Sequence, residues 1–348
     1  MLSRRKALSL EEGPSSVVIQ SILRSHDPTK DQGLVTRNTI ARVTRFPAGY
    51  RIGHWTDSTR RTGCTVILPP AGTTAAVDVR GGAPGTRETG VFTPGNLVSE
   101  IHALVFAGGS AFGLASASGV TSWLRRRGVG FAIGPARVPI VAAAILFDLG
   151  VGEAGAYPDE AAGEAACEDA RGGEIETGAV GAGSGATVGK VLGVARASRG
   201  GVGAASVAIR GGHGVSALVA VNAFGDVVDP ESGRRLAGAR GEGELFSTAR
   251  ALREADLRES PLAGAHTTLV CVATDVPFEE GSLKRVAIEA HDGLSRAVRP
   301  AHTVVDGDIA FALAPAGQPP PPLLTRLRVG AAAAEAVARA IVNAVTAP

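Results

Sequence analysis

The stretch His266-Thr-Thr-Leu-Val-Cys-Val272 is the most informative part of the sequence. It places polar residues directly before an apolar run that is typical of a buried β-strand. Further along, Asp306-Gly-Asp308 stands in the same way before the apolar run 309–314. By pattern alone, Thr267 is a β-former and Asp-Gly-Asp is a turn. A threonine hydroxyl needs activation to act as a nucleophile, and the α-amine of an N-terminal threonine can supply it if the chain is cut before Thr267.

Outward from this stretch, short β-branched runs alternate with alanine-rich runs, which predicts a layered α/β fold. Several of the expected strands are apolar without alternation, as in sheets that are covered on both faces. We expect strands at 64–68, 75–79, 103–107, 204–209, 215–221, 267–273 and 308–314. We expect helices at 111–127, 159–170, 242–255, 279–298 and 328–345, and a stiff loop at 318–322. Ser110 is predicted to be the N-cap of the helix that follows it.

The first 38 residues differ from the rest and predict a flexible extension. Ser3-Arg-Arg-Lys6 resembles a twin-arginine signal, but Glu11 and Glu12 interrupt the place of its apolar region. Residues 39–348 are expected to form a single catalytic domain.

Composition excludes several classes of protein. The net charge of +2 and the aromatic content of 4% argue against a nucleic-acid surface. No apolar run reaches the roughly 20 residues of a membrane helix, so no membrane partner is expected. Three cysteines, without Cys-x-x-Cys or His-x-x-x-His, argue against a disulfide framework or a structural zinc site. We therefore expect a cytoplasmic protein.

The glycine pattern Gly181-x-Gly183-x-x-Ala186 lacks a preceding strand and does not predict a dinucleotide site.

From residue 39 to 346 the chain resembles the DmpA-type family, which comprises L-aminopeptidase/D-amidases, β-peptidyl aminopeptidases and the nylon-oligomer hydrolase NylC. The stretches that carry the resemblance are Gly53–Thr56, Ala76–Thr89, Leu104–Leu114, Val180–Lys190, Ala220–Pro230, Thr267-Thr268, Ala290–Leu294 and Arg299–Asp308. Their order and spacing are specific to the family.

The resemblance implies a four-layer αββα sandwich of the N-terminal-nucleophile-hydrolase type, shared with the ornithine acetyltransferases. It implies that the chain cuts itself between His266 and Thr267 into 1–266 (the α chain) and 267–348 (the β chain). It further implies a homotetramer, a small amide or peptide substrate, and chemistry that requires no cofactor or metal.

The resemblance also assigns roles to single residues. Thr267 matches the nucleophile, and Asp306 with Asp308 matches the acidic pair that orients its amine and hydroxyl. Lys190, one of four lysines in the chain, matches a lysine near the nucleophile. Asn222 matches the amide that stabilises the oxyanion. The substrate-binding residues implied in the same way are Ile145, Phe147, Arg80 and Glu88.

Three positions depart from the family pattern. His266 replaces the usual asparagine or glycine before the nucleophile, and Phe147 replaces a tyrosine. Ile145 stands where the aminopeptidases have a glutamate that holds the substrate's amine. An isoleucine cannot pair with an ammonium group, and burying that group unpaired is costly.

The departures favour a threonine amidohydrolase that cleaves internal or blocked amides through an acyl-Thr267 intermediate. Three alternatives remain open at this stage. The protein could be an aminopeptidase that uses another carboxylate, such as Glu88, as its amine anchor. It could be an acyltransferase of the ornithine-acetyltransferase type, or an uncut binding protein without catalytic activity.

Overall fold

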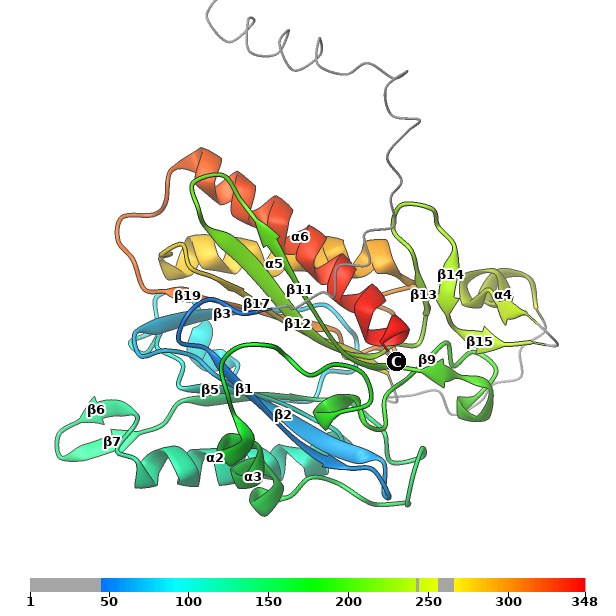
Figure 1. Ribbon diagram of the computed structural model, residues 1–348, viewed down its shortest axis with the longest axis horizontal. Helices are drawn as coiled ribbons and strands as arrows, with labels where there is room; N and C mark the ends of the chain where they lie inside the picture. Colours follow the sequence, from blue (N-terminus) through cyan, green and yellow to red (C-terminus); the bar gives the residue numbers. More distant parts are fainter. Residues whose placement is uncertain (1–44, 242–243, 256–265, 348) are drawn as a thin grey trace, which may run out of the picture. The chain divides into compact units, whose positions relative to one another are not determined.

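Two five-stranded sheets lie face to face at the centre of the computed structural model (Figure 1). The first sheet has the order β1-β2-β5-β8-β4 and the second has the order β11-β12-β17-β19-β3. The strands of the first sheet are β1 (Arg51–Asp57), β2 (Thr62–Leu68), β4 (Thr86–Arg87), β5 (Ala103–Ala107) and β8 (Val141–Ile145). Those of the second are β3 (Thr73–Val79), β11 (Gly201–Ala208), β12 (Gly214–Asn222), β17 (Thr267–Thr274) and β19 (Ile309–Pro315).

The structure describes residues 45–241, 244–255 and 266–347, all within the compact unit Val43–Pro348. The predicted extension 1–38 lies outside the described residues.

Pairing within the two sheets is antiparallel except between β5 and β8 and between β17 and β19.

The inner faces of the two sheets form a shared apolar core. Leu104 and Phe106 of the first sheet belong to one buried cluster with Leu269 and Phe311 of the second. The Phe106 and Phe311 rings lie 6.3 Å apart. Burial of this area is the main stabilising contribution of the sheet pair, and it explains why the strands are apolar without alternation.

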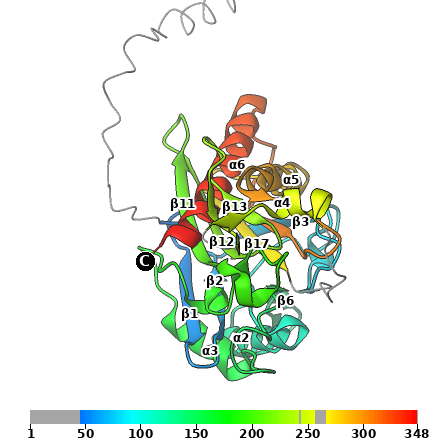
Figure 2. The ribbon, with the colours of Figure 1, turned by 90° about the vertical axis from the view of Figure 1, so that its right-hand side faces the viewer.

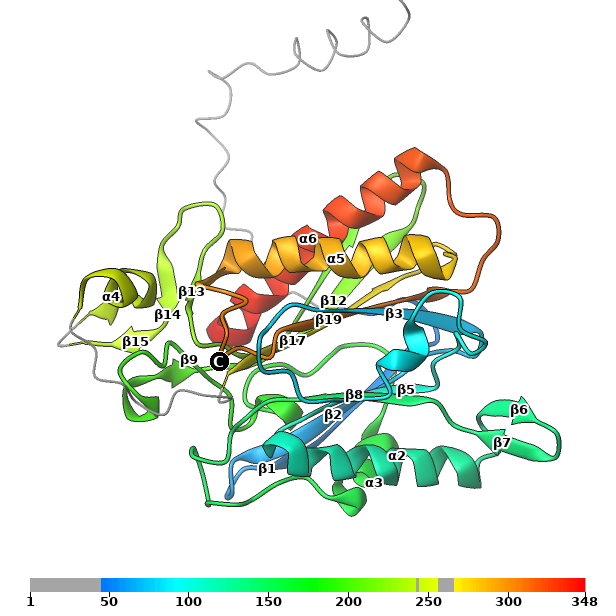
Figure 3. The ribbon, with the colours of Figure 1, turned by 180° about the vertical axis from the view of Figure 1, so that it is seen from behind.

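Helices cover the outer face of each sheet. The first sheet is covered by α2 (Ala115–Arg126) and α3 (Glu160–Asp169), and the second by α5 (Glu280–Ala297) and α6 (Leu323–Thr346). Figure 2 and Figure 3 show the resulting order of helix, sheet, sheet and helix. This confirms the predicted αββα sandwich.

The 24-residue helix α6 is long and apolar enough to cross a membrane. Its apolar residues are accounted for by packing, because Val337 and Ile341 are fully buried in the cluster shared with α5 and the second sheet. At Gly203 on β11 an added Cβ would lie 2.1 Å from the Ala340 carbonyl oxygen, which shows how closely the helix approaches the sheet.

Smaller elements surround the sandwich. They are β6 (Phe131–Ile133), β7 (Ala136–Val138), β9 (Thr187–Val188), β10 (Ser198–Arg199), β13 (Asp226–Val228), β14 (Arg235–Ala237), β15 (Ala239–Arg240), β16 (Leu245–Phe246), α4 (Thr248–Glu254), β18 (Val298–Arg299) and 3-10 turns at 90–92, 110–114, 181–183 and 194–196.

The structure corrects two local predictions. Ser110 is not an N-cap: it begins a 3-10 turn that follows Gly109, no side-chain cap bond forms there, and α2 starts only at Ala115. The helix expected over 242–255 is confined to α4, because Leu245–Phe246 pair with β15 and the Ser247 side chain caps the helix by accepting from the Arg250 N–H.

Candidate active site

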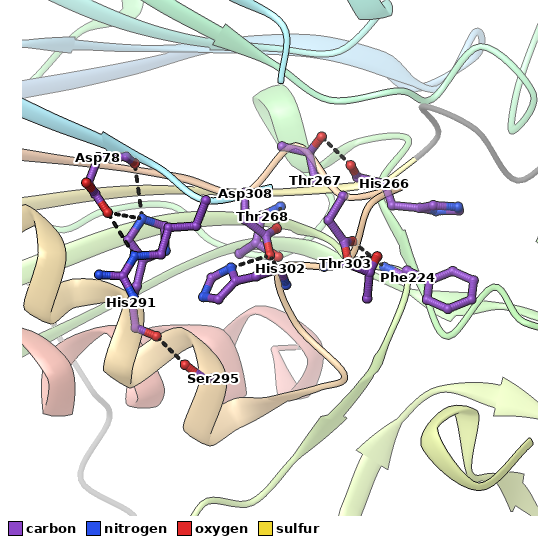
Figure 4. A network of polar contacts seen from close by, with 12 residues as sticks. Asp78, Phe224, His266, Thr267, Thr268, His291, Ser295, His302, Thr303 and Asp308 are labelled. Carbon is purple, nitrogen blue, oxygen red and sulfur yellow. Dashed lines mark hydrogen bonds and ion pairs between the residues drawn. The ribbon is translucent and has the colours of Figure 1, made fainter. Parts of the chain in front are cut away.

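Thr267 is the first residue of β17 and lies opposite Asn222, the last residue of β12. The pairing brings the predicted nucleophile and the predicted oxyanion amide together where two neighbouring inner strands of the second sheet end and begin. Thr267 is 3% exposed, and its Oγ1 donates a hydrogen bond of 2.5 Å to the carbonyl oxygen of His266 (Figure 4). The hydroxyl therefore lies beside the carbonyl of the bond that the sequence predicts to be cut.

The His266 carbonyl has a second donor. His266 forms an isolated parallel bridge with Asp306, and the Gly307 N–H donates to the His266 carbonyl oxygen over 2.8 Å. A Cβ on Gly307 would lie 2.7 Å from Thr267 Oγ1 and 2.8 Å from the Ala83 carbonyl oxygen, so glycine is required here. The His266 ring packs against Phe224, with centroids 5.0 Å apart.

Asp306 is buried, and both of its carboxylate oxygens accept hydrogen bonds. The Phe224 N–H donates to Oδ1 over 3.2 Å. The Thr303 N–H and hydroxyl donate to Oδ2 over 3.0 and 2.5 Å. Burial raises the pKa of Asp306 to about 6, and the negative charge of Asp308 acts in the same direction.

Asp308 is held on both of its carboxylate oxygens. Oδ1 accepts from the Thr268 N–H over 2.7 Å. Oδ2 accepts from the N–H and Nδ1 of His302 over 2.9 and 3.0 Å (Figure 4). In the uncut chain these bonds reach the backbone directly after Thr267 and not Thr267 itself. The contact of the acidic pair with the Thr267 amine and hydroxyl stays a prediction for the cleaved enzyme.

Lys190 is 2% exposed and lies against Asn222. Its Nζ donates to the backbone oxygen and to Oδ1 of Asn222 over 2.8 and 2.7 Å. Burial lowers the pKa of Lys190 to about 7, against the opposing effects of Asp306 and Asp148. A lysine poised near neutrality can gain or lose a proton during a reaction.

Asn222 connects three parts of the site. Its Oδ1 accepts from the Thr187 N–H over 3.0 Å, in addition to the bond from Lys190. Its Nδ2 donates to the Phe147 carbonyl oxygen over 3.0 Å. The amide is therefore firmly oriented next to Thr267.

The four predicted substrate-binding residues fall into two groups. Ile145 ends β8 with its side chain buried near Gly85, and Phe147 follows it with its carbonyl on Asn222. Arg80 and Glu88 are exposed. The Arg80 side chain pairs with Asp78 over 2.9 Å, while its backbone N–H donates to the Asp308 carbonyl oxygen over 3.0 Å.

Two polar residues beside the site were assigned no role from the sequence. His302 lies in the stretch 299–308 that carries the family resemblance, and this position was the only feature of the sequence that could have drawn attention to it. Asp148 accepts from the Gly109 N–H through Oδ1 over 2.6 Å. Burial raises the pKa of Asp148 to about 6, with Lys190 opposing the shift. No sequence pattern indicates that Asp148 lies near Lys190, because the two residues come together only in the folded chain.

Sequence comparison assigns a family to this arrangement. Residues 46–348 match the model of peptidase family S58. A Mycobacterium tuberculosis (strain H37Rv) protein named "uncharacterized aminopeptidase" is 42% identical over 324 residues, covering 85% of this chain and 91% of that protein. The 6-aminohexanoate-oligomer endohydrolase of Kocuria sp. (strain KY2) is 33% identical over 285 residues, covering 80% and 76%.

Solved structures agree with the fold. The β-aminopeptidase of Burkholderia sp. aligns with a TM-score of 0.65 and 24% identity, covering 87% of this chain and 86% of that chain. The L-aminopeptidase D-Ala-esterase/amidase of Ochrobactrum anthropi, described as a variant of the Ntn hydrolase fold, aligns with a TM-score of 0.66, 19% identity and the same coverage. The chain belongs to peptidase family S58 and is a hydrolase that acts on amide bonds.

Proposed function

We propose that the chain cuts its own His266–Thr267 bond and that the new N-terminal Thr267 then cleaves amide bonds through an acyl intermediate. One observation carries the proposal: the Thr267 hydroxyl and the Gly307 N–H both lie on the His266 carbonyl oxygen, at 2.5 and 2.8 Å. The nucleophile and a donor for the developing oxyanion thus lie beside the scissile carbonyl before the bond is cut.

In the cutting step, the Thr267 hydroxyl turns its proton away from the His266 carbonyl oxygen, and Oγ1 attacks the carbonyl carbon of His266. Lys190 takes the hydroxyl proton, a role supported by its pKa of about 7 and by its bonds to Asn222, the strand partner of Thr267. The peptide C–N bond breaks as its nitrogen gains a proton. This leaves His266 as an ester on Thr267, and water hydrolyses that ester to a His266 carboxylate and a free Thr267 amine.

In the hydrolytic step, the Thr267 amine takes the proton of its own hydroxyl while Oγ1 attacks the substrate carbonyl. The Asn222 amide stabilises the oxyanion. The leaving amine departs with a proton, and water releases the acid from Thr267. Asp306 and Asp308 hold the new N-terminus.

We propose that the preferred substrates are internal or N-blocked amides, in keeping with the name of the relative that is a 6-aminohexanoate-oligomer endohydrolase. The support is Ile145, a buried aliphatic side chain that offers no charge to a substrate amine. The aminopeptidase alternative is favoured by the 42% identical relative that carries that name. The acyltransferase and the uncut binding protein are outcomes that the experiments distinguish.

The test measures kcat/KM for one small amide with its α-amine free and with the same amine acylated, on wild type and Thr267→Ala. A desolvated ammonium without a carboxylate partner costs several kcal/mol, so we expect the acylated amide to be preferred by roughly a hundredfold. A higher kcat/KM for the amide with a free amine would support the aminopeptidase hypothesis instead. Acyl transfer to an added amine that outpaces hydrolysis would establish the acyltransferase.

We further propose a homotetramer, on the strength of the family resemblance. Light scattering coupled to size-exclusion chromatography of the matured protein measures the mass directly, and a monomer would contradict the proposal.

A further inference from the structure

His302 directs two donors at a single oxygen of Asp308. Its backbone N–H lies 2.9 Å and its ring Nδ1 lies 3.0 Å from Asp308 Oδ2 (Figure 4). A carboxylate only accepts hydrogen bonds, so Nδ1 carries the proton. The ring Nε2 is buried and has no hydrogen-bond partner among the described residues. The bond to Asp308 is therefore the only polar contact of the ring among those residues.

The backbone of His302 is arranged for this double contact. His302 has a φ of +56°, in the left-handed region that most L-residues avoid. Such a conformation is strained for a residue with a Cβ, and it persists when the surroundings require it. Here it brings the N–H and the ring of the same residue onto Asp308 Oδ2.

A second histidine, His291, packs against the His302 ring. The rings of His302 and His291 meet edge to face, with centroids 4.8 Å apart and an interplanar angle of 74°. His291 is fully buried on α5, and its Nε2 donates to the Asp78 carbonyl oxygen over 3.0 Å. Burial lowers the pKa of His291 to about 4, so the buttressing ring is neutral at neutral pH.

Asp78 is itself anchored. Its carboxylate forms ion pairs with Lys284 over 2.7 Å and with Arg80 over 2.9 Å. A continuous set of contacts thus runs from the edge strand β3 through His291 and His302 to Asp308. Asp308 Oδ1 then accepts from the Thr268 N–H over 2.7 Å, one residue from the nucleophile.

We propose that His302 is a positioning residue for the amide chemistry at Thr267. Through Nδ1–H it fixes the rotation of the Asp308 carboxylate, so that Oδ1 holds the backbone at Thr268 and Thr267 is presented in the attacking orientation. The inference rests on the proposed function of Thr267. Because His302 acts through Asp308 in this proposal, its loss lowers the self-cleavage rate and kcat and leaves KM unchanged.

The experiment uses variants that keep the left-handed backbone. Asparagine and aspartate both tolerate positive φ and have the same shape. In His302→Asn the side-chain NH₂ can stand where Nδ1 stands and donate to Asp308, whereas His302→Asp presents a carboxylate to a carboxylate. In His302→Gly the side-chain donor is absent, the backbone N–H of residue 302 remains, and positive φ carries no strain. His54→Gly, which removes a half-buried histidine bonded to Thr65 over 2.9 Å, controls for general loss of stability.

The readouts are the rate of self-cleavage, and kcat and KM per free N-terminal Thr267. We expect His302→Gly and His302→Asp to lose roughly tenfold to a hundredfold in self-cleavage and kcat, the range of one hydrogen bond to a charged group. We expect His302→Asn to remain within about threefold of wild type and His54→Gly to retain both rates.

Wild-type rates in His302→Gly and His302→Asp overturn the inference. It is equally overturned if His302→Asn loses as much as His302→Asp, since the donor would then not be the property that counts. These outcomes are distinct from failure of the proposed function, which shows as an uncut wild type or as full activity in Thr267→Ala. If His302→Gly does not fold, the matched Asn and Asp variants still decide.

Discussion

At the scale of single residues, the burial of Lys190 predicts how the rate of self-cleavage depends on pH. Burial lowers its pKa to about 7, and a base acts only after it has lost its proton. The rate of self-cleavage should therefore rise as the pH increases through about 7 and level off above it. We expect Lys190→Gln to cut at least roughly tenfold more slowly and to lose that rise. Densitometry of freshly refolded protein from pH 5.5 to 9 measures both effects, and an unchanged pH profile in Lys190→Gln would exclude Lys190 as the base.

Asp148 gives a prediction about stability. Burial raises the pKa of Asp148 to about 6 from an ordinary value of 3.8, against the opposing effects of the Gly109 N–H and the Thr62 hydroxyl. A carboxyl whose pKa is raised by folding stabilises the native state below the ordinary pKa. That contribution is lost as the pH rises through the folded-state value.

Asp148→Asn is neutral at every pH and can still accept from the Gly109 N–H. In a Thr267→Ala background we expect it to raise the free energy of unfolding by about 1–3 kcal/mol at pH 8 and by much less at pH 4.5. Lys190 is mostly neutral at pH 8, so little ion pairing is lost there. Urea unfolding at the two pH values is the measurement. The same change in the free energy of unfolding at both pH values, in either direction, would show that the buried charge is not the controlling feature.

At the scale of elements, the turn before β19 approaches the start of β17 so closely that residue 307 must be glycine. A Cβ there would lie 2.7 Å from Thr267 Oγ1. Gly307→Ala should therefore displace the hydroxyl from the His266 carbonyl and slow self-cleavage by roughly a hundredfold or more, as expected for misplaced reacting groups.

The control is Gly150→Ala, because nothing lies within 4 Å of a Cβ built at Gly150. Intact-mass spectra of both variants over time give the rates. Cleavage of Gly307→Ala at the rate of the control would mean that the close approach has no role in the reaction.

Local signals predicted seven of the ten strands in the two large sheets and the helices α2 to α6, but not β1, β4 or β8. The apolar runs gave β5 and β17 within one residue, and the arginines 125–127 with Gly128 marked the end of α2. The errors arose where tertiary contacts decide. The segment 242–255 was predicted to be one helix, yet Leu245–Phe246 pair with β15 and restrict the helix to α4.

At the scale of the whole molecule, the sandwich brings together site residues that are distant in sequence. Lys190 follows β9, Asn222 ends β12, Thr267 begins β17 and Asp308 precedes β19. The roles of these residues are predictions from the family resemblance. No sequence pattern could show that Asp308 is bonded to His302 and Thr268, or that Asp148 lies near Lys190, because these contacts exist only after the two sheets have packed.

The most direct test of the account is the intact mass of the purified protein, with N-terminal sequencing of the smaller product. The account predicts two chains, 1–266 and 267–348, the second beginning with Thr267, and a single uncut 35.1 kDa chain for Thr267→Ala. A smaller chain that begins at Thr268, or an active wild type that remains a single uncut chain, would contradict it.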